Sequence, residues 1–200
     1  MGKTIKKTAL LTVLSLIAIS FLTVFAIFVF APKTAGDFCN DMGMKKIALS
    51  CYEREYNKTG EFDDLIFLFD YAIFEDDYGR VTEYGEIALS RTTDFEYFCA
   101  QSDLNKTDGA YPTYDYYTTA IVDAYYAQGK KQDVAVFALN HVPSKGYSET
   151  TALYYAVQLA KDDASLLKFL GDEYGNGIKW TFTGKTTFKK AIETLGYKFN

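Results

Sequence analysis

The stretch "LIFLFDYAIFEDDYGRVTEYGEIAL", residues 65–89, decides the fold. It predicts two short helices, over about 62–75 and 78–90, joined by a turn at the acidic pair 76–77. The first helix is apolar on two faces. One face holds Leu65, Leu68, Phe69, Ala72 and Ile73, and the other holds Phe67, Tyr71 and Phe74. Because a helix that is apolar on two sides is covered on two sides, this one is predicted to lie in the middle of a stacked helical array.

The second helix has apolar and small residues at helical spacing, namely Val81, Tyr84, Gly85, Ala88 and Leu89. A glycine inside a helix costs about 1 kcal/mol relative to alanine. Gly85 therefore predicts a close approach of a neighbouring helix, with a tolerated surface glycine as the alternative.

The rest of the chain after residue 40 also reads as helix, with little strand-like alternation. A helix over 40–57 is expected to begin at Asn40 or Asp41 and to stop at Gly60. Further helices are predicted over 93–102, 113–128, 131–141, 148–160, 163–174 and 185–195.

Short turns recur along this region at nearly even spacing. They fall near 59–60, 91–92, 129–130 and 161–162, about 33, 37 and 33 residues apart. A helix-pair period in the low thirties is typical of an α-solenoid.

The stretch 65–89 resembles a tetratricopeptide (TPR) repeat. Leu65, Leu68 and Ala72 match apolar sites of the first helix of that repeat, and "DDY" matches its turn. Val81, Tyr84 and Ala88 match the packing sites of its second helix, and "YYAQGKK" at 125–131 matches another turn. Phe69 stands where the family has glycine or another small residue. The resemblance implies an all-α fold, a right-handed solenoid of antiparallel helix pairs over residues 40–200.

An apolar segment precedes this domain. The 25 residues between Lys7 and Lys33 carry no charge, enough to cross a hydrocarbon core that needs about 20 helical residues. We expect a basic stub at 1–8, a transmembrane signal-anchor at 9–31 and a linker at 32–39. A cleaved signal peptide and a buried core helix are the alternatives. Lys3, Lys6 and Lys7 before the span, against Lys33 after it, predict a cytoplasmic N-terminus and an extracytoplasmic helical domain at the cell membrane.

The charge balance limits the choice of partner. Residues 37–200 hold 17 basic and 26 acidic side chains. An acidic domain is poorly suited to nucleic acid, whose phosphates need a Lys/Arg surface. The same charge argues against binding of anionic lipid beyond the anchor at 9–31 itself.

The three cysteines do not form a disulfide framework. Cys51 and Cys99 lie on helices predicted to be neighbours and are a candidate pair, with buried free thiols as the alternative. Cys39 and Cys51 would be about 18 Å apart if one helix continued between them, too far for a bridge. With one histidine in the chain, we expect no Cys/His metal site. The sequence has no Gly-rich phosphate loop, and its histidine has no evident Ser or Cys partner, so we expect no cofactor and no catalytic residue. The paired carboxylates, among them Asp76–Asp77 and Asp162–Asp163, lie at helix starts and are interpreted as caps.

Tyrosine is the most informative residue type. The chain has 17 tyrosines, and tyrosine offers rigid, amphipathic contact area suited to recognition. Tyr114, Tyr117 and Tyr125 follow a helical stripe and are assigned to the core. Tyr111, Tyr116 and Tyr126 lie off that stripe and are the predicted partner-binding residues.

The sequence therefore predicts a non-enzymatic, membrane-anchored scaffold that binds a protein or peptide on a solenoid groove. The alternatives are a cell-envelope glycan-binding factor or enzyme that uses a tyrosine-rich groove, and a structural subunit of a membrane complex.

Overall fold

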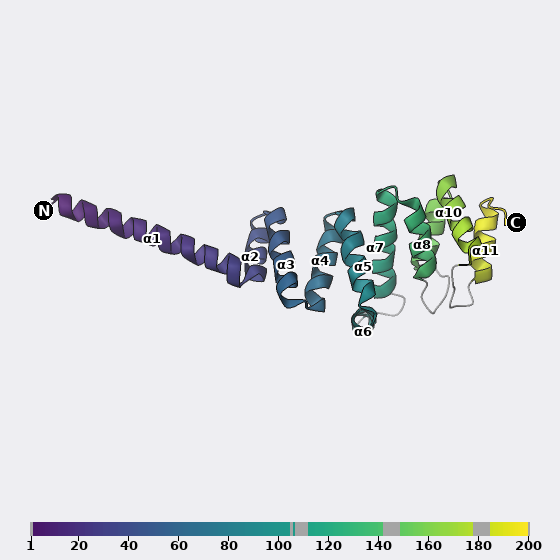
Figure 1. Cartoon of the computed structure of the whole chain (residues 1–200), viewed down its shortest axis with the longest axis horizontal. Helices are drawn as coiled ribbons and strands as arrows, with labels where there is room; N and C mark the ends of the chain where they lie inside the picture. The colour runs from purple at the N-terminus through teal and green to yellow at the C-terminus, as the bar shows by residue number, and fades with distance from the viewer. Residues whose placement is uncertain (1, 105, 107–111, 142–148, 178–184, 200) are drawn as a thin grey trace. The chain divides into compact units, whose positions relative to one another are not determined.

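The computed structural model describes residues 2–104, 106, 112–141, 149–177 and 185–199. In these ranges the chain forms helices and no strands (Figure 1). The helices are α1 (Gly2–Phe30), α2 (Pro32–Asp41), α3 (Lys45–Thr59), α4 (Phe62–Phe74), α5 (Tyr78–Ser90), α6 (Thr92–Asp103), α7 (Thr113–Ala127), α8 (Lys131–Asn140), α9 (Ala152–Ala160), α10 (Ala164–Gly175) and α11 (Lys185–Thr194). The all-helical class is confirmed. The chain divides into two compact units, Met1–Leu68 and Phe69–Asn200, with the boundary inside α4.

The first unit begins with α1, whose segment Thr12–Phe30 is long and apolar enough to cross a membrane and has no buried residue. Pro32 starts α2 directly after Ala31, and the amide of Ala35 donates to the Ala31 carbonyl. Residues 32–39, expected as a linker, thus belong to a helix. Proline suits the first helical turn because its missing N–H has no partner there.

The chain reverses between α2 and α3 at Met42–Met44, with Gly43 at φ 72°. The predicted continuous helix over 40–57 is therefore wrong, and so is the 18 Å separation of Cys39 and Cys51 that assumed it. Met44, and neither Asn40 nor Asp41, precedes α3. The predicted stop at Gly60 is confirmed, since Gly60 has φ 65° and its amide donates to the Tyr56 carbonyl.

The α2–α3 hairpin closes tightly around one ring. A Cβ on Gly36 would lie 2.5 Å from Cε1 of Tyr52, so only glycine allows the ring this position. The Tyr52 hydroxyl donates to Asp37 across the hairpin at 3.0 Å.

The second unit continues the pattern of helical hairpins. The connections α4–α5, α7–α8 and α9–α10 each have three residues, as α2–α3 does. These four turns are centred at 43, 76, 129 and 162. The turns predicted at 59–60 and 91–92 lie between hairpins, whereas those at 129–130 and 161–162 lie within them. The regular spacing predicted from the sequence therefore counted turns within hairpins together with turns between hairpins.

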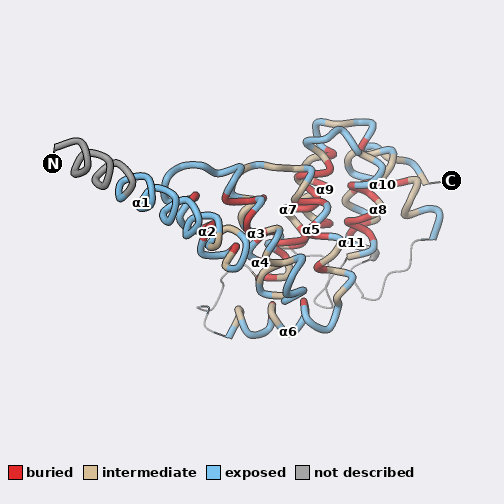
Figure 2. The backbone as a smooth tube through the Cα atoms, turned by 60° about the vertical axis from the view of Figure 1, so that its left-hand side comes forward, coloured by how far each residue is buried: buried red, intermediate tan, exposed pale blue. Residues whose placement is uncertain are grey.

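The helices of this unit contact one another both within hairpins and between neighbouring hairpins. α7 packs against α5, α8 and α9, while α8 also packs against α10, and α11 contacts α10. α6 contacts α5 and α7 but runs crosswise to them, as Figures 1 and 2 show. The buried residues concentrate along α5, α7, α8 and α9 (Figure 2).

The acidic pairs at two of the turns cap helices, as predicted. Asp77 accepts from the amide of Arg80 at the start of α5. Asp163 accepts from the amides of Ser165 and Leu166 at the start of α10. Arg80 beside Asp77, through hydrogen bonds and its charge, holds the pKa of that carboxyl below its usual value despite partial burial. These acids therefore stabilise helix starts.

The close approach predicted at Gly85 is confirmed. A Cβ there would lie 2.5 Å from Cδ1 of Ile121 and 3.1 Å from Cζ of Phe69. We expect Gly85→Ala to destabilise the protein by up to about 2 kcal/mol, because overpacking typically costs about 1–3 kcal/mol and the gain in helix propensity offsets only about 1 kcal/mol of it. Urea unfolding followed by circular dichroism measures the change.

A second substitution tests the cause of that loss. Ile121→Ala removes both side-chain atoms, Cδ1 and Cγ1, that would lie 2.5 and 2.6 Å from the added Cβ. The double variant should be more stable than the sum of the two single losses predicts. Additive losses would show that Gly85 is required for a reason other than its contact with Ile121.

Candidate functional site

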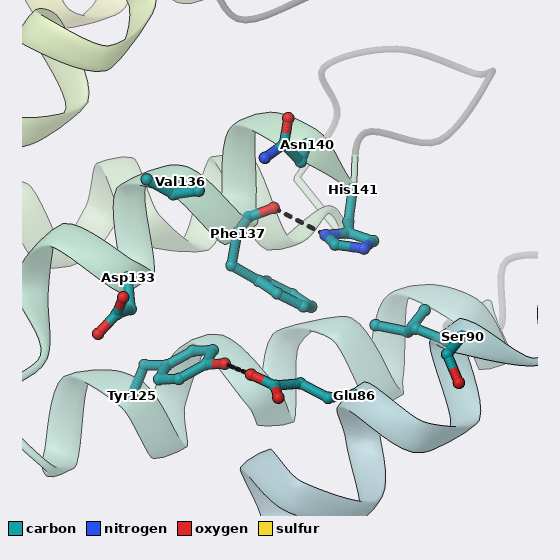
Figure 3. A pocket seen from close by; sticks show the side chains of 9 residues that line it. Glu86, Ser90, Tyr125, Asp133, Val136, Phe137, Asn140 and His141 are labelled. Carbon is teal, nitrogen blue, oxygen red and sulfur yellow. Dashed lines mark hydrogen bonds between the residues drawn. The ribbon is translucent and has the colours of Figure 1, made fainter.

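One pocket, within the second unit, is lined by side chains from α5, α7 and α8 (Figure 3). Its volume is about 460 Å³, and it is open to solvent on one side. The lining residues are Glu86, Leu89, Ser90, Tyr125, Asp133, Val136, Phe137, Asn140 and His141. The hairpin turn at Gly129 places two of them opposite each other, because Tyr125 and Asp133 are each four residues from it.

Two carboxylates flank a tyrosine at one end of the pocket. The Tyr125 hydroxyl donates a hydrogen bond to Oε1 of Glu86. Burial, this hydrogen bond and the negative charges of Glu86 and Asp133 all raise the pKa of Tyr125, so the ring keeps its proton. Glu86 and Asp133 are themselves exposed. This end of the pocket therefore carries negative charge at neutral pH.

The opposite wall is aromatic. Phe137 packs against Tyr125 with ring centroids 5.9 Å apart and stacks on His141 at 4.2 Å. Nδ1 of His141 lies 3.1 Å from the Phe137 carbonyl, which can only accept, so that nitrogen carries the proton (Figure 3). Burial lowers the pKa of His141 against the effect of this hydrogen bond. The neutral ring of His141 extends the aromatic wall.

The chemistry of this pocket is that of a cation-binding site. Carboxylates attract a positive group, and aromatic faces favour it further through cation–π attraction. Lys130 of the same chain already makes such a cation–π contact, with its Nζ 5.7 Å from the centroid of the Tyr125 ring. The pocket hydroxyl of Ser90 donates to the Ile87 carbonyl of its own helix. Among the described residues no group of three metal-ligating side chains comes together.

The predicted partner-binding tyrosines do not line this pocket. Tyr111 lies outside the described residues. Tyr116 on α7 is 46% exposed and packs edge-on against Tyr117. Tyr126 is half-buried, and its hydroxyl donates to Asp163 at 3.2 Å. Tyr125 is buried, as the helical stripe predicted, and it also lines the pocket. The symmetry of the turn at Gly129 was the signal that could have placed it there.

Most of the tyrosine hydroxyls with described partners serve a structural purpose. Six of them donate to a carboxylate on a different helix or helix cap. These bonds are Tyr52–Asp37, Tyr117–Asp70, Tyr125–Glu86, Tyr126–Asp163, Tyr155–Asp123 and Tyr197–Asp172. Six of the 17 tyrosines thus share one device, a hydroxyl that donates to a carboxylate from another part of the fold. We call these six bonds the tyrosine–carboxylate pairs.

The three cysteines are free, buried thiols. Cys51 lies in the first unit and Cys99 in the second, and a bond between them stays a prediction. Burial raises the pKa of Cys51, with a smaller effect from Cys39 across the hairpin. Burial and then the charge of Asp103 raise the pKa of Cys99 to about 12.

We expect none of the three thiols to react with a disulfide reagent such as DTNB in the folded chain at neutral pH. For Cys99 the thiolate fraction is about a thousandfold lower than for an ordinary thiol, because its pKa is raised to about 12. All three should react after unfolding in urea, whereas a Cys51–Cys99 bond would leave only Cys39 to react. A Lys161→Cys variant, at an exposed turn, should add one fast thiol to the folded protein. Rapid reaction of a native thiol would contradict the burial described here.

Comparison with known proteins finds no matching family model, no matching curated protein and no matching solved structure for this chain.

Proposed function

We propose that this protein is a membrane-anchored, TPR-like helical scaffold that binds a basic segment of a protein partner in the pocket of α5, α7 and α8. The observation that carries the proposal is the pairing of two exposed carboxylates, Glu86 and Asp133, with an aromatic wall. A lysine or arginine side chain matches both, by charge at its end and by its apolar stem along the rings.

The repeat architecture is supported by the hairpins. Their turns are centred 33, 53 and 33 residues apart, and the longer interval contains α6. First helices contact each other, α7 with α9, and so do second helices, α8 with α10. In a right-handed TPR-like solenoid such contacts produce an extended surface for a peptide.

The anchor is supported by α1. The segment Thr12–Phe30 has the length and apolarity of a single span and no buried residue. Three lysines before it and one after it favour an N-terminus in the cytoplasm and the helical domain outside. The scaffold would then act at the outer face of the cell membrane without catalysing a reaction.

The proposal is tested in membranes that hold the full chain, with a photo-crosslinking amino acid at Asn140 on the pocket rim. We expect a stoichiometric protein adduct in which the crosslinked segment contains lysine or arginine. Glu86→Gln with Asp133→Asn should reduce the adduct at least tenfold at limiting partner, about 1.4 kcal/mol. The glutamine still accepts the Tyr125 hydrogen bond, so the fold is retained.

A charge-matched control separates the pocket from the overall charge. Glu83→Gln with Glu96→Gln removes two exposed carboxylates of α5 and α6 that do not line the pocket, and it should leave the adduct unchanged. Equal loss in both variants would contradict a specific pocket. Turnover of an envelope polysaccharide by the wild-type chain, abolished by the pocket variant, would overturn the scaffold proposal in favour of an enzyme.

A further inference from the structure

The end of α1 is held by two basic side chains of α3. Nη1 of Arg54 donates to the Phe28 carbonyl at 3.0 Å, and Nζ of Lys58 lies 3.4 Å from the Phe30 carbonyl. The last carbonyls of a helix have no partner within it, and cations are favoured there by the helix dipole. These bonds place one face of α3 at the level where the apolar segment of α1 ends.

That face of α3 extends beyond the two cations. Ile47 lies seven residues before Arg54, and Lys58 lies four residues after it. With 3.6 residues per turn, all three project from the same side of the helix. All three are exposed, Ile47 by 47%. Lys45, nine residues before Arg54, projects from the opposite side.

The hairpin cannot swing freely away from α1. Ala31 is the single residue between α1 and α2, and its amide donates to the Ile27 carbonyl. Figure 1 shows α2 and α3 running crosswise to α1. A bilayer crossed by α1 therefore has its surface running along the length of α3, with the side of Ile47, Arg54 and Lys58 turned toward it.

The local charge differs from that of the remaining chain. Residues 31–60 carry five basic and four acidic side chains, whereas residues 61–200 carry 13 basic and 22 acidic ones. The expectation that the acidic domain avoids anionic lipid rested on the summed charge. Exposed charges separated by more than about 10 Å are largely screened at physiological salt, so the cations nearest to the surface decide what is bound there.

We propose that α3 lies on the bilayer surface where α1 leaves it, that Arg54 and Lys58 bind the phosphates of anionic lipid headgroups, and that Ile47 enters the boundary of the acyl chains. The guanidinium has five N–H donors, and the Phe28 carbonyl accepts from one of them. Arginine also pairs with phosphate through two parallel hydrogen bonds. The inference rests on the proposed anchor role of α1, but it is independent of the partner pocket and of which side of the membrane the domain occupies.

The depth of α3 is measured with tryptophan probes in the full chain, reconstituted in vesicles of phosphatidylcholine and phosphatidylglycerol in equal parts. The lipids carry bromine on the acyl chain, near the headgroup or near the bilayer centre, and quench tryptophan only at that depth. The parent chain, with Trp180 as its single tryptophan, gives the background. We expect shallow bromine to quench Ile47→Trp strongly and Lys45→Trp weakly.

Headgroup selectivity is measured by brominating one lipid at a time. Brominated phosphatidylglycerol should quench Ile47→Trp more than brominated phosphatidylcholine does, with a preference of about fivefold for each basic residue at the surface. Arg54→Gln with Lys58→Gln should abolish this preference. Lys45→Gln with Lys46→Gln, which removes the same charge from the same helix, should retain it.

A third probe separates the two ways in which the inference can fail. Phe21→Trp lies in the middle of Thr12–Phe30 and should be quenched by bromine at the bilayer centre. If it is not, α1 does not span the bilayer, and both the anchor and this inference are wrong. If it is quenched while Ile47→Trp and Lys45→Trp respond alike, the anchor stands and the surface contact of α3 is overturned. Equal loss of selectivity in both glutamine pairs would overturn the assignment to Arg54 and Lys58.

Discussion

Phe69→Ala is expected to lower the free energy of unfolding by about 3–5 kcal/mol, the range for a large buried aromatic side chain. Phe69 is fully buried and packs on Tyr117 with ring centroids 5.0 Å apart. Its Cζ also lies over Gly85. Phe69 supplies the bulk on α4, and Gly85 is the small residue that faces it on α5. Removing the ring leaves a cavity that Gly85 has no side chain to fill.

The matched control for this loss is Phe74→Ala in the same helix. Phe74 is 79% exposed, and its truncation should change stability by no more than about 0.5 kcal/mol. Urea unfolding of the full chain in detergent, followed by circular dichroism, compares the two variants. A difference below about 1 kcal/mol would show that Phe69 is not a packing centre of the second unit.

Asp163→Ala is expected to cost about 2–3 kcal/mol, because one carboxylate joins three helices. It caps α10 by accepting from the amides of Ser165 and Leu166, at 3.1 Å each. It also accepts from the Tyr126 hydroxyl of α7 and pairs with Lys131 of α8 at 2.7 Å. Loss of a cap costs about 1 kcal/mol, and each hydrogen bond to a charged group adds about 1 kcal/mol or more. Asp162→Ala at the exposed neighbour should be nearly neutral.

Asp163 also makes the stability of the protein depend on pH. Hydrogen bonds from Lys131 and Ser165 hold the pKa of Asp163 well below its usual value in the folded state. A carboxyl with a lowered folded pKa stabilises the protein above its unfolded pKa of about 4, and this contribution is lost as the pH falls through the folded value. Asp163→Asn keeps a cap but loses the charge. Wild type should exceed it in stability at pH 7, and the gap should shrink steadily below about pH 4. If the difference in stability between wild type and Asp163→Asn does not change with pH, the charge of Asp163 contributes nothing and its stabilising effect comes from the cap alone.

The sequence predicted the helices well where periodicity and turn chemistry agreed. The expected 78–90 coincides with α5, and the expected 62–75 with α4 to within a residue, because Asp76–Asp77 and Gly60 are strong local signals. The prediction failed at 32–44. There the reversal depends on Gly43 and on the contact of Gly36 with the Tyr52 ring. That contact is between residues 16 positions apart, and no local pattern reveals it.

The pocket could be predicted less well than the fold. Helical spacing separates a buried face from an exposed one, and by that criterion Tyr125 belongs to the core. Its ring is indeed buried, yet its hydroxyl reaches Glu86 at the pocket edge. The partner residue comes from α5, on the other side of α6 in the chain. Which acid meets which tyrosine is decided by how hairpins stack, and a single sequence does not encode this in its spacing alone.

The tyrosine–carboxylate pairs also bear on the conditions that the protein tolerates. An ion pair between exposed side chains weakens as salt rises, because mobile ions screen it. A phenol is a neutral donor, so a tyrosine–carboxylate pair has no opposite charge for added salt to mask. Since the phenol leaves the carboxylate ionised, the domain also keeps its negative charge, and like-charged copies repel one another on a crowded surface. Helix contacts made in this way therefore persist as salt rises, whereas the repulsion between molecules is strongest at low salt and weakens as salt is added.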